Sequence, residues 1–347
     1  MPTYIVLPII TLLAIALAKI EQVSAFGLSA LPLAIVFGML YGHFSLRVED
    51  KREQQFSTFC KQKLLRLGII LFGFGLSFQQ ILAVGWQAVV VDLVVIGTVF
   101  SVGTFVGIKV LKLHRDVAIL IAAGSAICGA AAILATESVL KPKQEQVTIA
   151  IATVVLFGTL AMFSYPFIYQ WVDMSEQSFG IYIGSTAHEV AQAVAAGQSI
   201  NDETMQTAVV VKLIRVMMLA PFILMLSSVL CHLSNRNDSR IASTANGCAS
   251  SRIDNKAQRE KSVIIIPWFV FGFMATAMIN SVVILPESLK AVLSFASQFS
   301  LAMAMAALGA QTQWASIKKA GPKPLILALI LFIMLICGGF FLNSWLI

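Results

Sequence analysis

Long apolar runs separated by short polar stretches follow one another along the whole chain. A run of roughly 17 to 25 apolar residues is what an α-helix needs to cross a bilayer. The pattern therefore predicts an all-α polytopic membrane protein, in which residues 1–347 form a single integral membrane domain. The runs fall at about residues 4–19, 25–42, 64–82, 86–109, 117–139, 146–170, 177–197, 204–231, 262–281, 290–311 and 322–345.

Composition agrees with this pattern. Of the 347 residues, 58% are hydrophobic and 12% are charged, whereas about a quarter of the residues of a soluble domain are charged. The N-terminal MPTYIVLPII lacks the basic residues that precede a cleavable signal. The five cysteines are scattered, which predicts neither a disulfide framework nor a zinc cluster.

The basic residues border the apolar runs, so the net charge of +7 is typical of topology determinants and not of a nucleic-acid partner. The one long polar stretch, 232–261, holds six Lys or Arg and no periodicity. It is interpreted as a flexible cytoplasmic connector.

Three pairs of segments resemble each other, which predicts an internal duplication. We expect a first repeat over 25–170 and a second, permuted repeat over 177–345. The pairs are GSAICGAAAILA (124–135) with GSTAHEVAQAVA (184–195), LSFQQI (76–81) with LGAQTQ (308–313), and IVFGML (35–40) with FVFGFM (269–274).

The direction of the repeats constrains the number of crossings. If every run crosses fully, 64–82 and 290–311 run in opposite directions, whereas 117–139 and 177–197 run in the same direction. One duplication cannot be both inverted and parallel. The conflict disappears if 117–139 and 177–197 are re-entrant hairpins, which leaves about nine full spans and makes all the repeats inverted. Eleven spans with two broken helices are the alternative.

Loop charge favours the hairpins. In the hairpin topology almost all basic loop residues lie on one side, which the positive-inside rule assigns to the cytoplasm together with the N-terminus. The basic residues on that side are Arg47, Lys51, Arg52, Lys61, Lys63, Arg66, Lys109, Lys112, Arg115, Lys141, Lys143, the six of 232–261, Lys318, Lys319 and Lys323, whereas Lys19 and Lys290 lie on the other.

Each predicted hairpin carries a Gly-Ser step near its middle, at Gly124 and Ser125 and again at Gly184, Ser185 and Thr186. Glycine lets the backbone turn, and Ser185 or Thr186 can cap the half-helix that follows. The N-terminus of a half-helix is a ready site for an anion. Close packing of small residues between helices is the alternative.

Two cations lie deep in the run 204–231. Lys212 and Arg215 are about one turn apart, so they share a face. Buried cations usually face a cavity or a partner. We expect an anion clamp beside the hairpin tips, and a pair of ion bridges to Glu189 or Asp92 is the alternative.

The second hairpin differs from the first by two titratable residues, because His188 and Glu189 stand where the first has Cys128 and Gly129. Either could carry a coupling proton, although Glu189 could also only balance Arg215. Asp92, in VVVDLVV, is a further intramembrane acid that could pair with a basic residue or bind a cation.

A metal site is not expected. The string H-E-x-x-Q differs from the zinc motif H-E-x-x-H, because Gln192 stands in the place of the second histidine. No other cofactor is expected either.

The strings GSAICGAAAI, GSTAHEVAQAVAAG and VKLIRVMMLAP, in this order and spacing, resemble the bacterial inner-membrane YeiH-type family, whose suggested activity is sulfate export. The resemblance extends over essentially the whole chain. It implies membership of the cation/proton antiporter and anion transporter superfamily, and hence inverted repeats with interrupted helices.

These observations together predict a secondary transporter, not an enzyme, that moves a small inorganic or organic anion through the lipid bilayer by alternating access. Sulfate or an organosulfonate is the substrate we expect, with protons or sodium as coupling ion. A homo-oligomer is compatible with the sequence. The absence of a G-x-x-x-x-G-K-[ST] motif argues against direct use of ATP. An anion channel is the alternative, and an intramembrane enzyme is a weaker one.

Overall fold

The computed structural model describes residues 2–20, 29–44, 51–229, 267–283, 285–311 and 320–346. Helices account for nearly all of these residues, and the described part of the chain contains no strand. The predicted all-α architecture is confirmed. The predicted connector at 232–261 lies outside the described residues.

Five described helices are long and apolar enough to cross a membrane, and each overlaps a predicted run. They are α7 with η3 (Gly85–Phe105 and Val106–Val110), α10 (Gln144–Tyr169), α13 with its continuation (Asp202–Met217, reaching Val229), α16 (Glu287–Gln311), and the run α18, η5 and α19 (Pro322–Ile333, Met334–Gly338 and Gly339–Leu346). Shorter apolar helices include α1 (Thr3–Leu17), α3 (Ala30–Phe44) and α15 (Trp268–Val282). The total of about nine full spans stays a prediction.

The predicted run 64–82 has different boundaries in the structure. Helical structure begins earlier, because α4 (Lys51–Phe59) continues through η1 (Cys60–Leu64) into α5 (Leu65–Phe72). The apolar run therefore begins inside a longer helical segment, because α4 is polar and gives no apolar signal. The run also breaks at η2 (Gly73–Gly75), after which the Ser77 hydroxyl caps α6 (Phe78–Ala83) by accepting from the Gln80 N–H at 3.2 Å.

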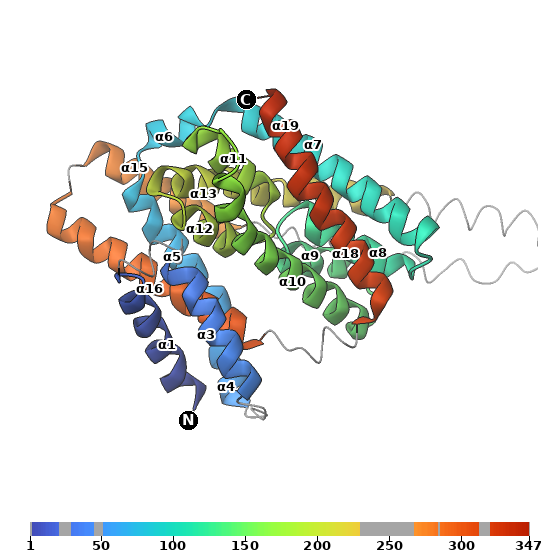
Figure 1. The fold of residues 1–347 in the computed structure, drawn as a ribbon, viewed down its shortest axis with the longest axis horizontal. Helices are drawn as coiled ribbons and strands as arrows, with labels where there is room; N and C mark the ends of the chain where they lie inside the picture. Colours follow the sequence, from blue (N-terminus) through green and yellow to red (C-terminus); the bar gives the residue numbers. More distant parts are fainter. Residues whose placement is uncertain are drawn as a thin grey trace, which may run out of the picture.

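The helices pack into two bundles (Figure 1). The first bundle consists of α1, α3, α4, α5, α6, α15 and α16. Its closest pair is α3 with α16, where glycines let the backbones touch. A Cβ on Gly38 would collide with the Ala306 carbonyl, and a Cβ on Gly309 would collide with the Ile35 carbonyl and lie 2.9 Å from the Met39 nitrogen. Small residues at helix contacts are typical of membrane proteins.

The second bundle consists of α7, α8 (Arg115–Ala126), α9 (Ala130–Leu140), α10, α11 (Glu176–Thr186), α12 (Val190–Gln198), α13, α18 and α19. The principal helix contacts between the two bundles join α12 to α3 and to α16. Helix α12 therefore lies at the boundary between the bundles.

The chain folds back on itself between α8 and α9, which we call the first hairpin. Gly129, at φ 65°, precedes α9 and supplies the reversal. A Cβ on Gly124 in α8 would lie 2.8 Å from the Ile133 side chain in α9, so residues on either side of Gly129 face each other. Helix α9 ends at Lys141 in the left-handed region, and Pro142 follows.

The chain also folds back between α11 and α12, the second hairpin. The start of α11 lies beside the start of α13, because the Thr204 hydroxyl donates to the Glu176 carbonyl at 3.2 Å. The end of α12 lies there too, since a Cβ on Gly197 would meet Met205. A broken helix running straight on would place Glu176 far from the start of α13, so the contacts support the hairpin over the broken span.

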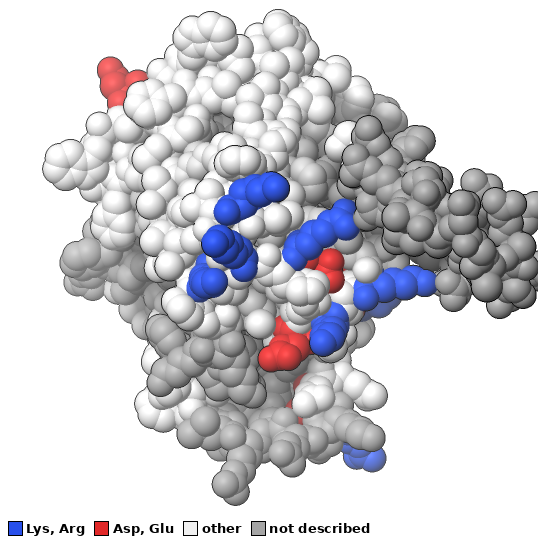
Figure 2. Space-filling view, turned by 90° about the vertical axis from the view of Figure 1, so that its right-hand side faces the viewer, with Lys and Arg blue, Asp and Glu red and all other residues white. Residues whose placement is uncertain are grey.

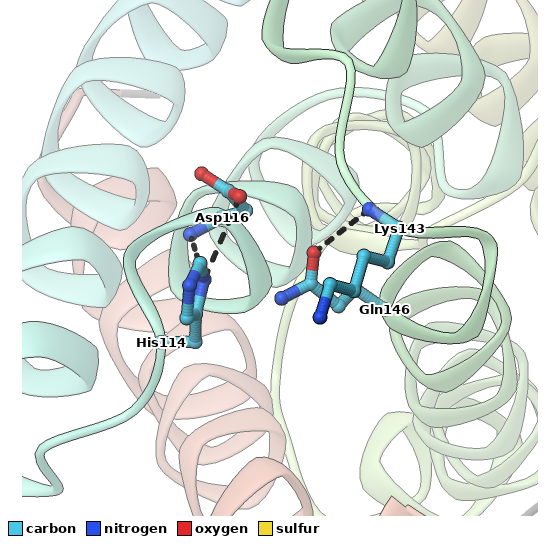
Figure 3. Close-up of polar contacts among 4 residues, drawn as sticks. All are labelled: His114, Asp116, Lys143 and Gln146. Carbon is cyan, nitrogen blue, oxygen red and sulfur yellow. Dashed lines mark hydrogen bonds and ion pairs between the residues drawn. The ribbon is translucent and has the colours of Figure 1, made fainter.

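The two hairpins start from opposite ends of the second bundle. Helix α10 has 26 residues and is therefore about 39 Å long. Three residues separate its start from the end of the first hairpin, and it ends shortly before the second. Helices α8 and α10 pack against each other, and a Cβ on Gly124, near the end of α8, would lie 3.1 Å from the Val154 side chain in the first half of α10, so the two helices start at the same end. Figure 3 labels residues at the two starts, the His114–Asp116 pair and the Lys143 N–H that donates to Gln146 Oε1 at 3.0 Å.

Basic side chains gather on the end of the molecule where α8, α10 and α18 begin (Figure 2). Helix η3 also ends here, because a Cβ on Gly107 would touch both Ala118 and Leu327. These are residues that loop charge assigns to the cytoplasm. The basic residues at these helix ends are Lys109, Lys112, Arg115, Lys141, Lys143 and Lys323.

Candidate functional site

The tips of the two hairpins, residues 127–129 and 187–189, touch each other. A Cβ on Gly129 would lie 2.7 Å from Cγ of Glu189 and 3.3 Å from the His188 carbonyl oxygen, so only glycine fits there. The four hairpin arms have 12, 11, 11 and 9 residues. At 1.5 Å per residue each arm covers about half of a bilayer core of roughly 30 Å. The meeting point, which we call the crossing, therefore lies near mid-depth.

Arg215 of α13 connects the two hairpins at the crossing. It is fully buried, and its guanidinium donates to the carbonyl oxygens of Ala126 (2.9 Å from Nε), Ser125 (3.1 Å from Nη2) and Ser185. These carbonyls belong to the last turns of α8 and α11. One side chain thus contacts the ends of two helices that come from opposite directions.

Lys212 acts in the same way one turn earlier on α13. It is also fully buried, and Nζ donates to the carbonyl oxygens of Ile127 (2.8 Å) and Ala187. These two residues directly follow α8 and α11. A helix C-terminus has unpaired carbonyls and a negative dipole end, so a cation there is stabilised. Hydrogen bonds to the carbonyls offset part of the cost of burying the charges.

The alternative of ion bridges is not what the structure has. Within the described ranges, no ion pair joins Lys212 or Arg215 to Glu189 or Asp92. The hydrogen bonds of both cations go to backbone carbonyls. The two side chains supply positive potential at the crossing and hold the hairpin tips in place.

The Gly-Ser steps lie beside the tips and not in them. Gly124 and Ser125 are in the last turn of α8, and Gly184, Ser185 and Thr186 are in the last turn of α11. The expectation that these glycines make the turns was wrong. The first tip turns at residue 129, and the second is built from extended backbone at positions 187 and 189.

The expectation that Ser185 or Thr186 caps the following half-helix was also wrong. The Ser185 hydroxyl donates to the Ile181 carbonyl at 2.8 Å, and the Thr186 hydroxyl donates to the Tyr182 carbonyl at 2.5 Å. A hydroxyl inside a helix can bond to the carbonyl four residues back, and both do so here. The Ser125 hydroxyl is buried and has no hydrogen-bond partner among the described residues.

Glu189 is the N-cap residue of α12. Its N–H donates to Gln192 Oε1 at 3.1 Å, which is one half of a capping box. Gln192 Nε2 is buried without a partner in the described structure. Sequence reasoning treated Gln192 only as a failed metal ligand, although a capping residue followed three positions later by Gln was the available signal.

His188 and Asp92 are placed at the crossing as well. Both are buried, and both interact electrostatically with Lys212 and Arg215. Nδ1 of His188 and both carboxylate oxygens of Asp92 lack a hydrogen-bond partner in the part of the chain that the structure describes. The fold thus brings together the ionisable residues that the sequence singled out in three separate runs.

Two tyrosines that sequence reasoning missed support the second hairpin. The Tyr165 hydroxyl in α10 shares a hydrogen bond with Thr186 at 2.8 Å, and the Tyr182 hydroxyl donates to the Ile336 carbonyl in η5 at 2.8 Å. Their rings pack edge to face with centroids 5.5 Å apart. A buried tyrosine needs a partner for its hydroxyl, so a tyrosine in an apolar run was the signal for such a contact.

Comparison with known proteins places these features in a family. Residues 2–328 match the family model described as "Conserved hypothetical protein 698". The chain is 45% identical over 339 residues to the UPF0324 inner membrane protein YeiH of Escherichia coli strain K12, covering 96% of this chain and 91% of that protein. It is 44% identical over 349 residues to a UPF0324 membrane protein of Yersinia pestis, covering 99% and 91%. No solved structure matches.

Proposed function

Because the chain belongs to the UPF0324 family of bacterial inner-membrane proteins, we propose that it is a secondary active transporter of a small anion. The substrate class that we favour is sulfate or an organosulfonate, moved by alternating access. One observation carries the proposal: two half-helix pairs from opposite ends meet at mid-depth around two buried cations. Interrupted helices that meet at the midplane are how many transporters build a site.

The anion site that we propose lies at the starts of α9 and α12. The first N–H groups of a helix have no intrahelical partner and form its positive end. Both helices begin at the crossing, and Gly129 leaves the start of α9 without a side chain. Ala131, in the first turn of α9, is exposed. Lys212 and Arg215 add positive potential without direct bonds to the anion.

Alternating access would be a movement of one bundle against the other. Helix α12 carries part of the proposed site and also forms the principal contacts between the bundles. Side-chain hydrogen bonds across the boundary include Ser29 to Ser199 and Gln80 to Gln206, each at 3.2 Å. Such neutral hydrogen bonds are weak enough to exchange as the bundles move.

His188, Glu189 and Asp92 are our candidates for the coupling step. All three lie at the crossing, and His188 and Asp92 have unpaired polar atoms there. Ionisable side chains inside a membrane protein mark proton relays and ion pathways. Protonation, or sodium binding at Asp92, would change the charge that the anion meets.

The test is transport by purified protein in liposomes. Sulfate, thiosulfate, small sulfonates and small carboxylates are offered with and without pH and sodium gradients, and flux and current are recorded. Saturable exchange that responds to a gradient of protons or sodium is the expected result. An anion flux that does not saturate with anion concentration and does not respond to those gradients would instead identify an anion channel.

A matched pair of variants tests the site itself. Arg215→Ala removes a buried cation at the crossing, whereas Lys290→Ala removes a cation on the surface, at the start of α16. We expect the first to abolish transport and the second to leave it intact. An Arg215→Ala protein that is folded, by its elution volume in detergent, and still transports at the normal rate would contradict the proposed site.

A further inference from the structure

One carboxylate already occupies the place where an anion would bind. Glu189 is the N-cap residue of α12, so its side chain extends from the N-terminus of that helix. The same carboxylate lies over Gly129, the residue that precedes α9, because a Cβ there would be 3.1 Å from Oε1 of Glu189. One side chain therefore lies between the positive ends of two helices.

A second observation points to a ligand at this place. The amide of Gln192 lies at the start of α12, held by the bond from the Glu189 N–H to Oε1 at 3.1 Å. Its other atom, Nε2, is a buried donor without a partner among the described residues. A buried donor left unpaired costs free energy comparable to a lost hydrogen bond. It would be satisfied by an acceptor arriving at the start of α12.

Glu189 can also leave this place more easily than its neighbours can. It is partly exposed, whereas His188 and Cys128 are buried. No ion pair fixes its carboxylate in the described structure. Among the described residues, the potential of Lys212, with which Glu189 interacts electrostatically, is what holds the carboxylate.

We propose that the Glu189 carboxylate is a tethered anion that fills the transport site and is displaced when the substrate binds. This proposal rests on the proposed function. An acceptor oxygen of the substrate takes the place of the carboxylate at the starts of α9 and α12, and Gln192 Nε2 donates to it as well. The site then holds either its own side chain or the substrate, and it is not left as an empty positive pocket.

The charges around the site are consistent with an exchange of one anion for another. Lys212 and Arg215 face the crossing from α13, Asp92 from α7, Cys128 from the first tip, and His188 from the second. With Glu189 in place, two basic side chains and two carboxyl groups lie at the crossing. A substrate that enters while Glu189 stays would add a third acidic group, so displacement keeps the number of acidic groups at two.

Chemical rescue tests the tethered anion without knowledge of the substrate. Glu189→Ala removes the carboxylate, and formate at pH 7 supplies a free one small enough to replace it. We expect the melting temperature in detergent to fall by several degrees and to recover in formate, but not in gluconate of equal ionic strength. Wild type and Glu137→Ala, which removes a carboxylate elsewhere on the first hairpin, should respond equally to both salts. Equal responses of Glu189→Ala to formate and gluconate would overturn the proposal.

A second variant guards against loss of folding. Glu189→Gln has the size of the native side chain but carries no charge, so the positive helix ends hold it less tightly and formate should displace it. The same selective stabilisation by formate is therefore expected, and its absence in a folded Glu189→Gln protein would also count against the proposal.

Binding of sulfate separates this proposal from the proposed function. If the carboxylate leaves the site free about a tenth of the time, its neutralisation should tighten apparent affinity about tenfold. Glu189→Gln should therefore bind radiolabelled sulfate more tightly than wild type. If wild type binds and transports sulfate but Glu189→Gln binds it no more tightly, the tethered anion is refuted and the proposed function stands. Wild type that transports no anion of the panel would refute the proposed function, whereas the rescue experiment would still decide the role of Glu189.

Discussion

Arg215 donates through Nε to the carbonyl oxygen of Ala126 at 2.9 Å, across 89 positions of sequence. Through Nη1 it also reaches Ser185, at the end of the other hairpin. A residue of one continuous helix thereby stabilises the interrupted ends of two others. The interruptions would otherwise leave helix carbonyls unpaired inside the protein.

Replacement of Arg215 is expected to destabilise the protein before it affects any substrate. Arg215→Ala leaves the carbonyls of Ser125, Ala126 and Ser185 without their donor. Each unpaired buried group costs about 1–3 kcal/mol, so the loss in free energy of unfolding should be several kcal/mol. Arg215→Lys keeps the charge and should lose less. Thermal denaturation in detergent measures the stability of both variants. Equal melting temperatures for wild type, Arg215→Ala and Arg215→Lys would contradict the carbonyl contacts.

Gly309 and Gly97 form a matched pair for the packing of α16 on α3. A Cβ on Gly309 would collide with backbone of α3, whereas a Cβ on Gly97 in α7 would meet nothing within 4 Å. Overpacking costs about 1–3 kcal/mol, so Gly309→Ala should lower the melting temperature. Gly97→Ala should be neutral or stabilising by roughly 0.5–1 kcal/mol, because alanine stabilises the interior of a helix more than glycine does. A Gly309→Ala protein as stable as Gly97→Ala would mean that the two helices are further apart.

The hairpins can be tested by labelling cysteines at their bases. In a background without the five native cysteines, Pro142→Cys lies at the base of the first hairpin and Ile200→Cys at the base of the second. The bases lie at opposite ends of the 26-residue α10. A membrane-impermeant maleimide should therefore label position 142 from the cytoplasm and position 200 from the periplasm in intact cells and inverted vesicles. Labelling of both from one side would rule out the arrangement.

A disulfide across the bundle boundary should stop transport. The hydroxyls of Ser29 and Ser199 are 3.2 Å apart and belong to different bundles. Ser29→Cys with Ser199→Cys, in the same cysteine-free background, should therefore cross-link on oxidation, and transport should fall and return on addition of a reductant. Either single cysteine variant should be insensitive to oxidation. Full transport by the cross-linked protein would show that the bundles need not separate at this point.

Much of the fold could be predicted from residues alone, because a bilayer demands long apolar helices and penalises buried charge. The folded-back segments followed from the repeat GSAICG and GSTAHE combined with loop charge, and the deep positions of Lys212 and Arg215 followed from their apolar neighbours. The polar α4 could not be found in this way, since it carries no apolar signal.

The details of the crossing depend on contacts that no local pattern encodes. Ser185 and Thr186 look like helix caps in the sequence, yet each lies at the end of a helix and bonds to a carbonyl four residues back. The Arg215 guanidinium donates to backbone carbonyls, which any residue could supply. The position of Glu189 over Gly129 depends on two tips that come together only in the folded chain.

Helix α12 is only nine residues long, or about 14 Å. Its first turn holds Glu189 at the crossing, and along its length it packs against α3 and α16 of the other bundle. A helix this short does not bend between the two places, so a small displacement where it packs against α3 also moves Glu189 at its N-terminus. A substitution on the face of α12 that packs against α3 and α16, far from any charge, should therefore alter which anions the protein accepts.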